Sequence, residues 1–165
     1  MITSSIVRYL ATLRSVFARP ATEVLPRAPS DGSRARFPGS IQLRHVDVGS
    51  CNACEIEIAS AFGPVHDAAR FGAWLVASPR HADGLLVTGV VTRNMADPLR
   101  KTLAAVARPR VVVACGDCAV DGGVFRGAYG VEAGLDEVVD VDVRIPGCPP
   151  HPTAITEALR ATTGR

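Results

Sequence analysis

The pattern of hydrophobic and polar positions changes character near residue 41. In residues 1–19, apolar side chains recur at nearly helical spacing, and the only charged side chains are three arginines, which predicts a basic amphipathic helix. Residues 20–40 are interrupted by four prolines and two glycines, which predicts a linker. From residue 41 onwards, short apolar segments alternate with helical ones. We therefore expect an N-terminal helix and linker over residues 1–40 and one folded domain over residues 41–165.

Five apolar segments beyond residue 40 predict β-strands, and three longer segments predict helices. The predicted strands are residues 41–48, 73–77, 84–88, 110–114 and 138–145. The predicted helices are residues 52–62, with an apolar face of Ile56, Ala59 and Phe62, residues 97–107, with Asp97 as cap and Pro98 at the first position, and residues 153–162. Because strands that alternate with helices form parallel sheets, we expect an α/β fold, a flavodoxin-like three-layer sandwich.

Three uses are open for the predicted helix of residues 1–19. It could dock on another subunit, lie on an anionic membrane surface, or remain a loosely ordered arm. Its content of arginine and serine also resembles a transit peptide weakly.

Composition and charge restrict the partners and the compartment. A net charge of +2 is too small to indicate a nucleic-acid partner. The five cysteines accompany no secretory signal, and clustered cysteines in a reducing cytosol are more often metal-binding or catalytic than disulfide-bonded. No apolar run approaches the roughly 20 residues that span a bilayer. The region near the N-terminus lacks the twin-arginine pair that would indicate export of a folded protein.

Four of the five cysteines follow predicted strands. Cys51 and Cys54 form a C-x2-C pair after the first strand, Cys118 follows the fourth strand, and Cys148 follows the last. Ligands in open α/β sheets lie outside the carboxyl ends of the strands, so residues about 100 positions apart in sequence can meet there. Four converging thiolates are the ligand set of one 4Fe–4S cluster, which predicts an electron carrier with no catalytic residue of its own.

Two other uses of these cysteines are possible. A structural zinc site also takes four thiolates, although such sites usually show two C-x2-4-C pairs. A dithiol redox pair also follows a strand and opens a helix, but it needs no further cysteines. Cys115 ends an apolar run, so we expect it to be a small buried core residue and Cys118 to be the ligand.

Two acidic residues follow the C-x2-C pair on the same predicted helix. Glu55 and Glu57 lie two positions apart and cannot share a helix face. Either one of them points to the cluster edge, or both only complement the helix dipole. We also expect a partner subunit to cover this edge, together with Arg80 and His81 of a polar loop.

Six motifs give this chain a resemblance to a known family. It resembles the small, cluster-bearing subunit shared by nickel–iron hydrogenases and respiratory complex I. The motifs are Gly49–Ile58, Ser78–Asp83, Thr88–Thr92, Gly116–Ala119, Gly122–Phe125 and Ile145–Pro150. The complex I subunit has two adjacent cysteines where this chain has C-x2-C, the spacing of hydrogenase small subunits. Residues 51–58, 70–72 and 78–83 look most like membrane-bound, energy-converting hydrogenases of the formate hydrogenlyase type.

The resemblance implies a role and a set of partners. It implies that Cys51, Cys54, Cys118 and Cys148 hold the 4Fe–4S cluster nearest a nickel–iron site, and that Cys115 is not a ligand. It implies an oxidoreductase subunit that is inactive alone and works with a nickel–iron large subunit, a ferredoxin-like cluster subunit and a membrane arm. The expected location is peripheral, on the cytoplasmic face of the cell membrane. The alternative within the family is the equivalent subunit of a complex I-like quinone oxidoreductase.

Overall fold

The computed structural model describes residues 37–165, so the predicted helix of residues 1–19 and most of the linker lie outside the described residues. The strands are β1 (Ile41–Asp47), β2 (Ala73–Leu75), β3 (Gly84–Thr88), β4 (Val91–Thr92), β5 (Val111–Cys115), β6 (Val131–Ala133) and β7 (Val143–Ile145). The helices are α2 (Ala53–Ala61), α3 (Arg93–Ala105), α4 (Asp117–Asp121), α5 (Leu135–Val138) and α6 (Pro152–Thr163). Three short 3-10 helices are η1 (Ala68–Phe71), η2 (Pro79–His81) and η3 (Gly123–Phe125).

The main sheet has five parallel strands in the order β2-β1-β3-β5-β7. Counting only these strands along the chain, the order is 2-1-3-4-5, which is the flavodoxin-like arrangement. The predicted α/β fold with a parallel sheet is therefore confirmed. The strand order reverses between β1 and β3, and this is the position at which open sheets of this type bind their ligands.

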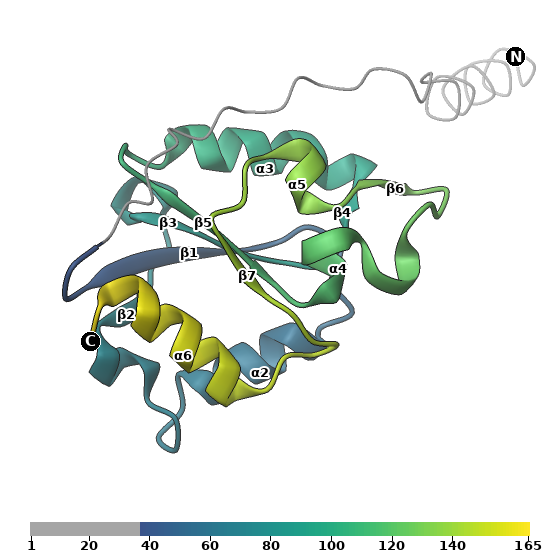
Figure 1. The fold of residues 1–165 in the computed structure, drawn as a ribbon. Helices are drawn as coiled ribbons and strands as arrows, with labels where there is room; N and C mark the ends of the chain where they lie inside the picture. The colour runs from purple at the N-terminus through teal and green to yellow at the C-terminus, as the bar shows by residue number, and fades with distance from the viewer. Residues whose placement is uncertain (1–36) are drawn as a thin grey trace, which may run out of the picture.

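Helices cover both faces of the sheet and form the outer layers of the sandwich (Figure 1). On one face, α3 and α5 pack on alternate side chains of β3 and β5, including Leu85 and Val112. On the other face, α2 and α6 pack on the intervening side chains, including Leu86 and Val113. Since β3 and β5 are buried on both faces, they need the continuous apolar runs that identify them in the sequence.

The helix α2 forms where it is predicted, but its buried face is different. The residues that turn inward are Cys54, Ile58 and Ala61, whereas Ile56 is 61% exposed and Ala59 is also exposed. The first turn determines this orientation, because the Cys54 thiol is buried at the edge of the sheet. The helix is therefore predicted at the right residues but with the wrong side facing the sheet. The predicted apolar face of Ile56, Ala59 and Phe62 lies largely outside the core.

The helix α3 begins earlier than predicted and passes through a proline. Its cap is Thr92 rather than Asp97, and Pro98 lies inside the helix at an exposed position. Its buried face is formed by Ala96, Leu99 and Leu103. Burial of this face stabilises the helix by more than the loss of the backbone hydrogen bond that proline cannot donate. The predicted helix start at Asp97 is therefore wrong.

The segment 138–145 is only partly a strand. Val138 is a buried residue at the end of the four-residue helix α5, and β7 contains only the last three residues of the predicted strand. A second, two-stranded antiparallel sheet of β4 and β6 was not predicted. None of the helices in residues 37–165 combines the length and the apolar character that a membrane crossing requires.

Candidate metal centre

The carboxyl ends of four strands lie level with one another at one edge of the sheet. Asp47 of β1 is aligned with Thr88 of β3, Thr88 with Cys115 of β5, and Cys115 with Ile145 of β7. The segments that follow β1, β5 and β7 carry the four predicted ligands. Cys51 and Cys148 lie in loops, Cys54 in the first turn of α2 and Cys118 in α4. The fold therefore places the segments of Cys51, Cys118 and Cys148 at the same edge, as the sequence predicts.

Hydrogen bonds join the loops of Cys118 and Cys148. The Asp117 amide donates to the Gly147 carbonyl over 2.9 Å, and the Gly147 amide donates to the Asp117 carboxylate over 2.7 Å. The Gly116 amide donates to the Ile145 carbonyl over 2.8 Å, which continues the pairing of β5 with β7. These bonds fix the two loops relative to each other, although 29 residues separate their cysteines.

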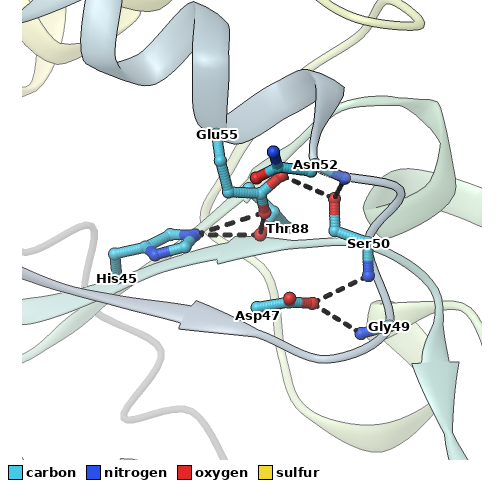
Figure 2. A network of polar contacts seen from close by, with 7 residues as sticks. All are labelled: His45, Asp47, Gly49, Ser50, Asn52, Glu55 and Thr88. Atoms are coloured by element: carbon cyan, nitrogen blue, oxygen red, sulfur yellow. Dashed lines mark hydrogen bonds and ion pairs between the residues drawn. The ribbon is translucent and has the colours of Figure 1, made fainter.

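The loop of Cys51 is fixed by its own side chains. One carboxylate oxygen of Asp47 accepts hydrogen bonds from the Gly49 amide over 2.8 Å and the Ser50 amide over 2.7 Å. The Ser50 hydroxyl accepts from the Asn52 amide over 3.1 Å and donates to the Glu55 carboxylate over 2.7 Å. Figure 2 shows how these bonds hold the turn between β1 and α2.

All five cysteines are free thiols, and four of them influence one another electrostatically. Cys54 is buried, Cys118 is half-buried, and Cys51 and Cys148 are exposed. Burial, followed by the negative charges of Glu55 and the other three thiolates, raises the pKa of Cys54 to about 12. The pKa of Cys118 is also raised, first by burial and then by Cys148 and Cys51. The sulfurs of Cys54 and Cys118 therefore need an electropositive group nearby if they are to be thiolates.

Two glycines leave room beside the sulfurs. A Cβ atom on Gly116 would lie 2.6 Å from the Cys54 sulfur, and a Cβ atom on Gly123 would lie 3.3 Å from the Cys118 sulfur. Both glycines have positive φ angles, +92° and +48°. The backbone thus comes directly against two of the four sulfurs.

The fifth cysteine lies in the core. Cys115 ends β5, is fully buried, and packs in the layer between the sheet and α2 and α6. Burial, followed by the charges of Cys54 and Glu55, raises the pKa of its thiol to about 12. The prediction that Cys115 is a buried core residue is confirmed.

A polar network beside the cysteines was not predicted in full. The Glu55 side chain turns toward β3, where its carboxylate accepts a hydrogen bond from the Thr88 hydroxyl. His45 of β1 contacts the same hydroxyl, with 2.9 Å between Nε2 and Oγ1. Glu55 was a candidate in the sequence, but His45 and Thr88 were not, because they lie 10 and 33 positions away from it and no local pattern connects them.

The polar loop before β3 lies away from this edge. Arg80 and His81 belong to η2, and Asp83 follows them directly before Gly84, the first residue of β3. The loop therefore ends at the amino end of β3, whereas the cysteine loops follow carboxyl ends. The expectation that Arg80 and His81 belong to the cysteine edge is wrong.

The four predicted ligands fit an iron–sulfur cluster in chemistry and placement. They are four free thiols on three segments that follow strands ending at one edge of the sheet. Within the described residues, no group of three or more His, Cys, Asp or Glu side chains is arranged to hold a single metal ion. In a 4Fe–4S cube each thiolate binds a separate iron, so the sulfurs do not have to surround one ion.

Comparison with known proteins identifies the family. Residues 51–162 match the family model described as NADH ubiquinone oxidoreductase, 20 Kd subunit. The chain belongs to this family. The match begins at Cys51 and includes all four cysteines of the site. Membership confirms the resemblance that the motifs indicate and places the chain among the subunits of oxidoreductases.

Relatives in the 20 Kd subunit family include hydrogenase subunits. The chain is 48% identical over 115 residues to formate hydrogenlyase subunit 7 of Escherichia coli, which covers 70% of this chain and 45% of that protein. It is 49% identical over 115 residues to the probable membrane-bound hydrogenase subunit mbhJ of Pyrococcus furiosus, which covers 70% of this chain and 69% of that protein. The chain thus spans less than half the length of the first of these relatives.

A solved structure with the same fold comes from the membrane-bound sulfane sulfur reductase, an archaeal respiratory membrane complex. Its matching chain is 31% identical to this one, with a TM-score of 0.66. The match covers 76% of this chain and 70% of that chain. The architecture of the described domain is therefore one that a respiratory membrane complex contains.

Proposed function

We propose that this chain is the electron-transfer subunit of a membrane-bound nickel–iron hydrogenase or formate hydrogenlyase-like complex. It holds one 4Fe–4S cluster through Cys51, Cys54, Cys118 and Cys148. The chain supplies no catalytic residue, and the nickel–iron site belongs to a separate large subunit. When bound, the cluster accepts and passes on one electron at a time.

The observation that carries this proposal is the convergence of three cysteine loops at the carboxyl edge of one sheet. The aligned ends of β1, β5 and β7 give each loop a fixed starting point, and hydrogen bonds between Asp117 and Gly147 join two of them. The family match over residues 51–162 supports the same conclusion. An iron–sulfur cluster uses all four sulfurs, whereas a dithiol pair would leave Cys118 and Cys148 without a role.

The residues around the cysteines determine which sulfurs meet the solvent. Cys54 faces the interior, while Cys51 and Cys148 are exposed. Exposed apolar side chains also lie on α2, which contains Cys54, and on η3, which follows the helix of Cys118; they are Ile56, Val124 and Phe125. Apolar residues of this kind around a redox centre suit burial by a partner subunit, which shortens the path of the electron and excludes water.

The proposed partners are a nickel–iron large subunit, a ferredoxin-like cluster subunit and a membrane arm. The two hydrogenase relatives support the first of these, since their names are those of formate hydrogenlyase and membrane-bound hydrogenase subunits. Through these partners the chain would lie peripherally at the cytoplasmic face of the membrane. Residues 1–40 are proposed as a separate N-terminal segment that precedes the cluster domain.

The second candidate function is cluster subunit of a complex I-like quinone oxidoreductase. The family description, which names NADH ubiquinone oxidoreductase, supports it. The C-x2-C spacing of Cys51 and Cys54 favours the hydrogenase branch instead. The two functions differ in whether the large subunit contains nickel and in the source of the electrons.

We expect the complex that is purified through this chain, under anaerobic conditions, to contain nickel and to respond to hydrogen. Exposure to hydrogen should produce the EPR signal of a reduced cluster, because electrons leave the nickel–iron site through the nearest cluster. Cys118→Ala in the same complex is the control and should lack this cluster's signal. A complex without nickel, whose cluster is reduced by a quinol but not by hydrogen, would instead establish the complex I-like function.

A further inference from the structure

The Glu55 side chain lies in an enclosed position between the cysteine loop and the sheet. It belongs to the first turn of α2, directly after Cys54, and its side chain is only 19% exposed. One carboxylate oxygen faces the end of β3 and the other faces the turn that carries Cys51 (Figure 2). A carboxylate with so little exposure is screened weakly by water, so its charge acts strongly on its surroundings.

The hydrogen-bond donors around Glu55 can be assigned one by one. The Ser50 hydroxyl donates to Oε2 over 2.7 Å, and the Thr88 hydroxyl donates to Oε1. A hydroxyl has only one hydrogen, so the Thr88 oxygen must accept the hydrogen bond from His45, whose Nε2 lies 2.9 Å away. The His45 ring thus carries a hydrogen on Nε2, and that nitrogen is also 3.6 Å from Oε1 of Glu55.

This arrangement suits the ionised form of Glu55. An ionised carboxylate only accepts hydrogen bonds, and here each of its oxygens receives one from a hydroxyl group. Such charge-assisted bonds are shorter and stronger than neutral ones. Ser50 and Thr88 therefore hold a negative charge in one orientation, beside the buried thiol of Cys54.

Glu55 directly follows the buried Cys54 on α2, and its hydrogen-bond partner Ser50 directly precedes Cys51. The carboxylate is therefore held beside two of the four cysteines, which agrees with the contribution of Glu55, after burial, to the raised pKa of Cys54. Glu57 lies two positions further along the helix and cannot share the helix face of Glu55. The two glutamates therefore differ in their placement relative to the cysteines.

We propose that the fixed negative charge of Glu55 lowers the reduction potential of the cluster held by the four cysteines. Reduction adds one electron to a site that lies beside this carboxylate, so the negative charge opposes the reduction. The inference rests on the proposed function, because it requires the cluster to be present. It adds to that function a residue that influences the reduction potential of the cluster.

The test is a one-electron redox titration of the full-length chain, reconstituted anaerobically with iron and sulfide and reduced with dithionite. The cluster is followed by EPR, and the iron content is measured for every variant. Glu55→Gln removes the charge with little change in shape. We expect it to raise the equilibrium constant for reduction about tenfold, which is about 59 mV for a one-electron couple.

Two further variants separate charge from structure. Glu55→Asp keeps the charge and should restore most of the wild-type potential. Glu57→Gln removes the same formal charge from the same helix and should shift the potential much less. The inference is overturned if Glu55→Gln has the wild-type potential, if Glu57→Gln shifts it equally, or if Glu55→Gln binds no iron and so reveals a role in assembly. A wild-type chain that binds no iron–sulfur cluster would overturn the proposed function as well.

Discussion

Replacing Cys118 with alanine should abolish cluster binding, whereas replacing Cys115, three residues earlier, should leave it intact. Cys118 lies in the short helix α4 beyond the end of β5 and is half-buried, and Cys148 and Cys51 contribute, after burial, to its raised pKa. Cys115 is the last residue of β5 and is fully buried in the layer beneath α2 and α6. Their different positions relative to the end of the strand explain the opposite outcomes.

The size of each effect follows from the role of the sulfur. A 4Fe–4S cluster is held by four thiolates, so loss of one ligand should leave the Cys118→Ala protein with little or no intact cluster. Cys115→Ala only truncates a core side chain, with an expected cost of about 1 kcal/mol in the free energy of unfolding. Iron and sulfide content and the visible absorbance of both variants measure the difference. Retention of the cluster by Cys118→Ala, together with its loss in Cys115→Ala, would show that the ligand is assigned to the wrong cysteine.

A single methyl group at Gly116 should have a comparably large effect. The residue has φ of +92° and ψ of 153°, a backbone conformation that is essentially limited to glycine. A Cβ atom would also lie 2.6 Å from the Cys54 sulfur, closer than such atoms can approach. Gly116→Ala should therefore cost about 1–3 kcal/mol in backbone strain and displace the thiol of a ligand.

The measurement for Gly116→Ala combines thermal unfolding with iron content after anaerobic reconstitution. Gly130→Ala is a matched control, since a Cβ atom at Gly130 would have no heavy atom within 4 Å. We expect Gly130→Ala to bind iron as the wild type does and Gly116→Ala to bind little. Full iron content in Gly116→Ala would mean that the Cys54 sulfur does not need its present position.

The sequence predicts the sheet and the meeting of the cysteines because both depend on short-range signals. The runs at residues 84–88 and 110–114 are mostly apolar, as central strands of a parallel sheet require, and they form β3 and β5 almost as predicted. Parallel strands bring their carboxyl ends to one edge, so the cysteine segments come together once the strands are known. No side-chain detail is needed for this step.

The features that the sequence does not predict depend on tertiary contacts. The phase of α2 follows from the burial of Cys54, which competes with the more apolar Ile56 for the inward position. The passage of α3 through Pro98 follows from burial of Ala96 and Leu99 on the sheet. The contact of His45 with Thr88 joins neighbouring strands whose residues are 43 positions apart in sequence. Local propensity contains no information about these contacts.

The most direct test of the central claim is the metal content of the full-length chain, purified or reconstituted under anaerobic conditions. The proposed ligand set predicts about four iron atoms per chain. It also predicts an EPR signal that appears on one-electron reduction and is absent from Cys118→Ala. A chain that binds about one zinc ion, has no iron and shows no reducible signal would contradict the account and establish a structural zinc site in its place.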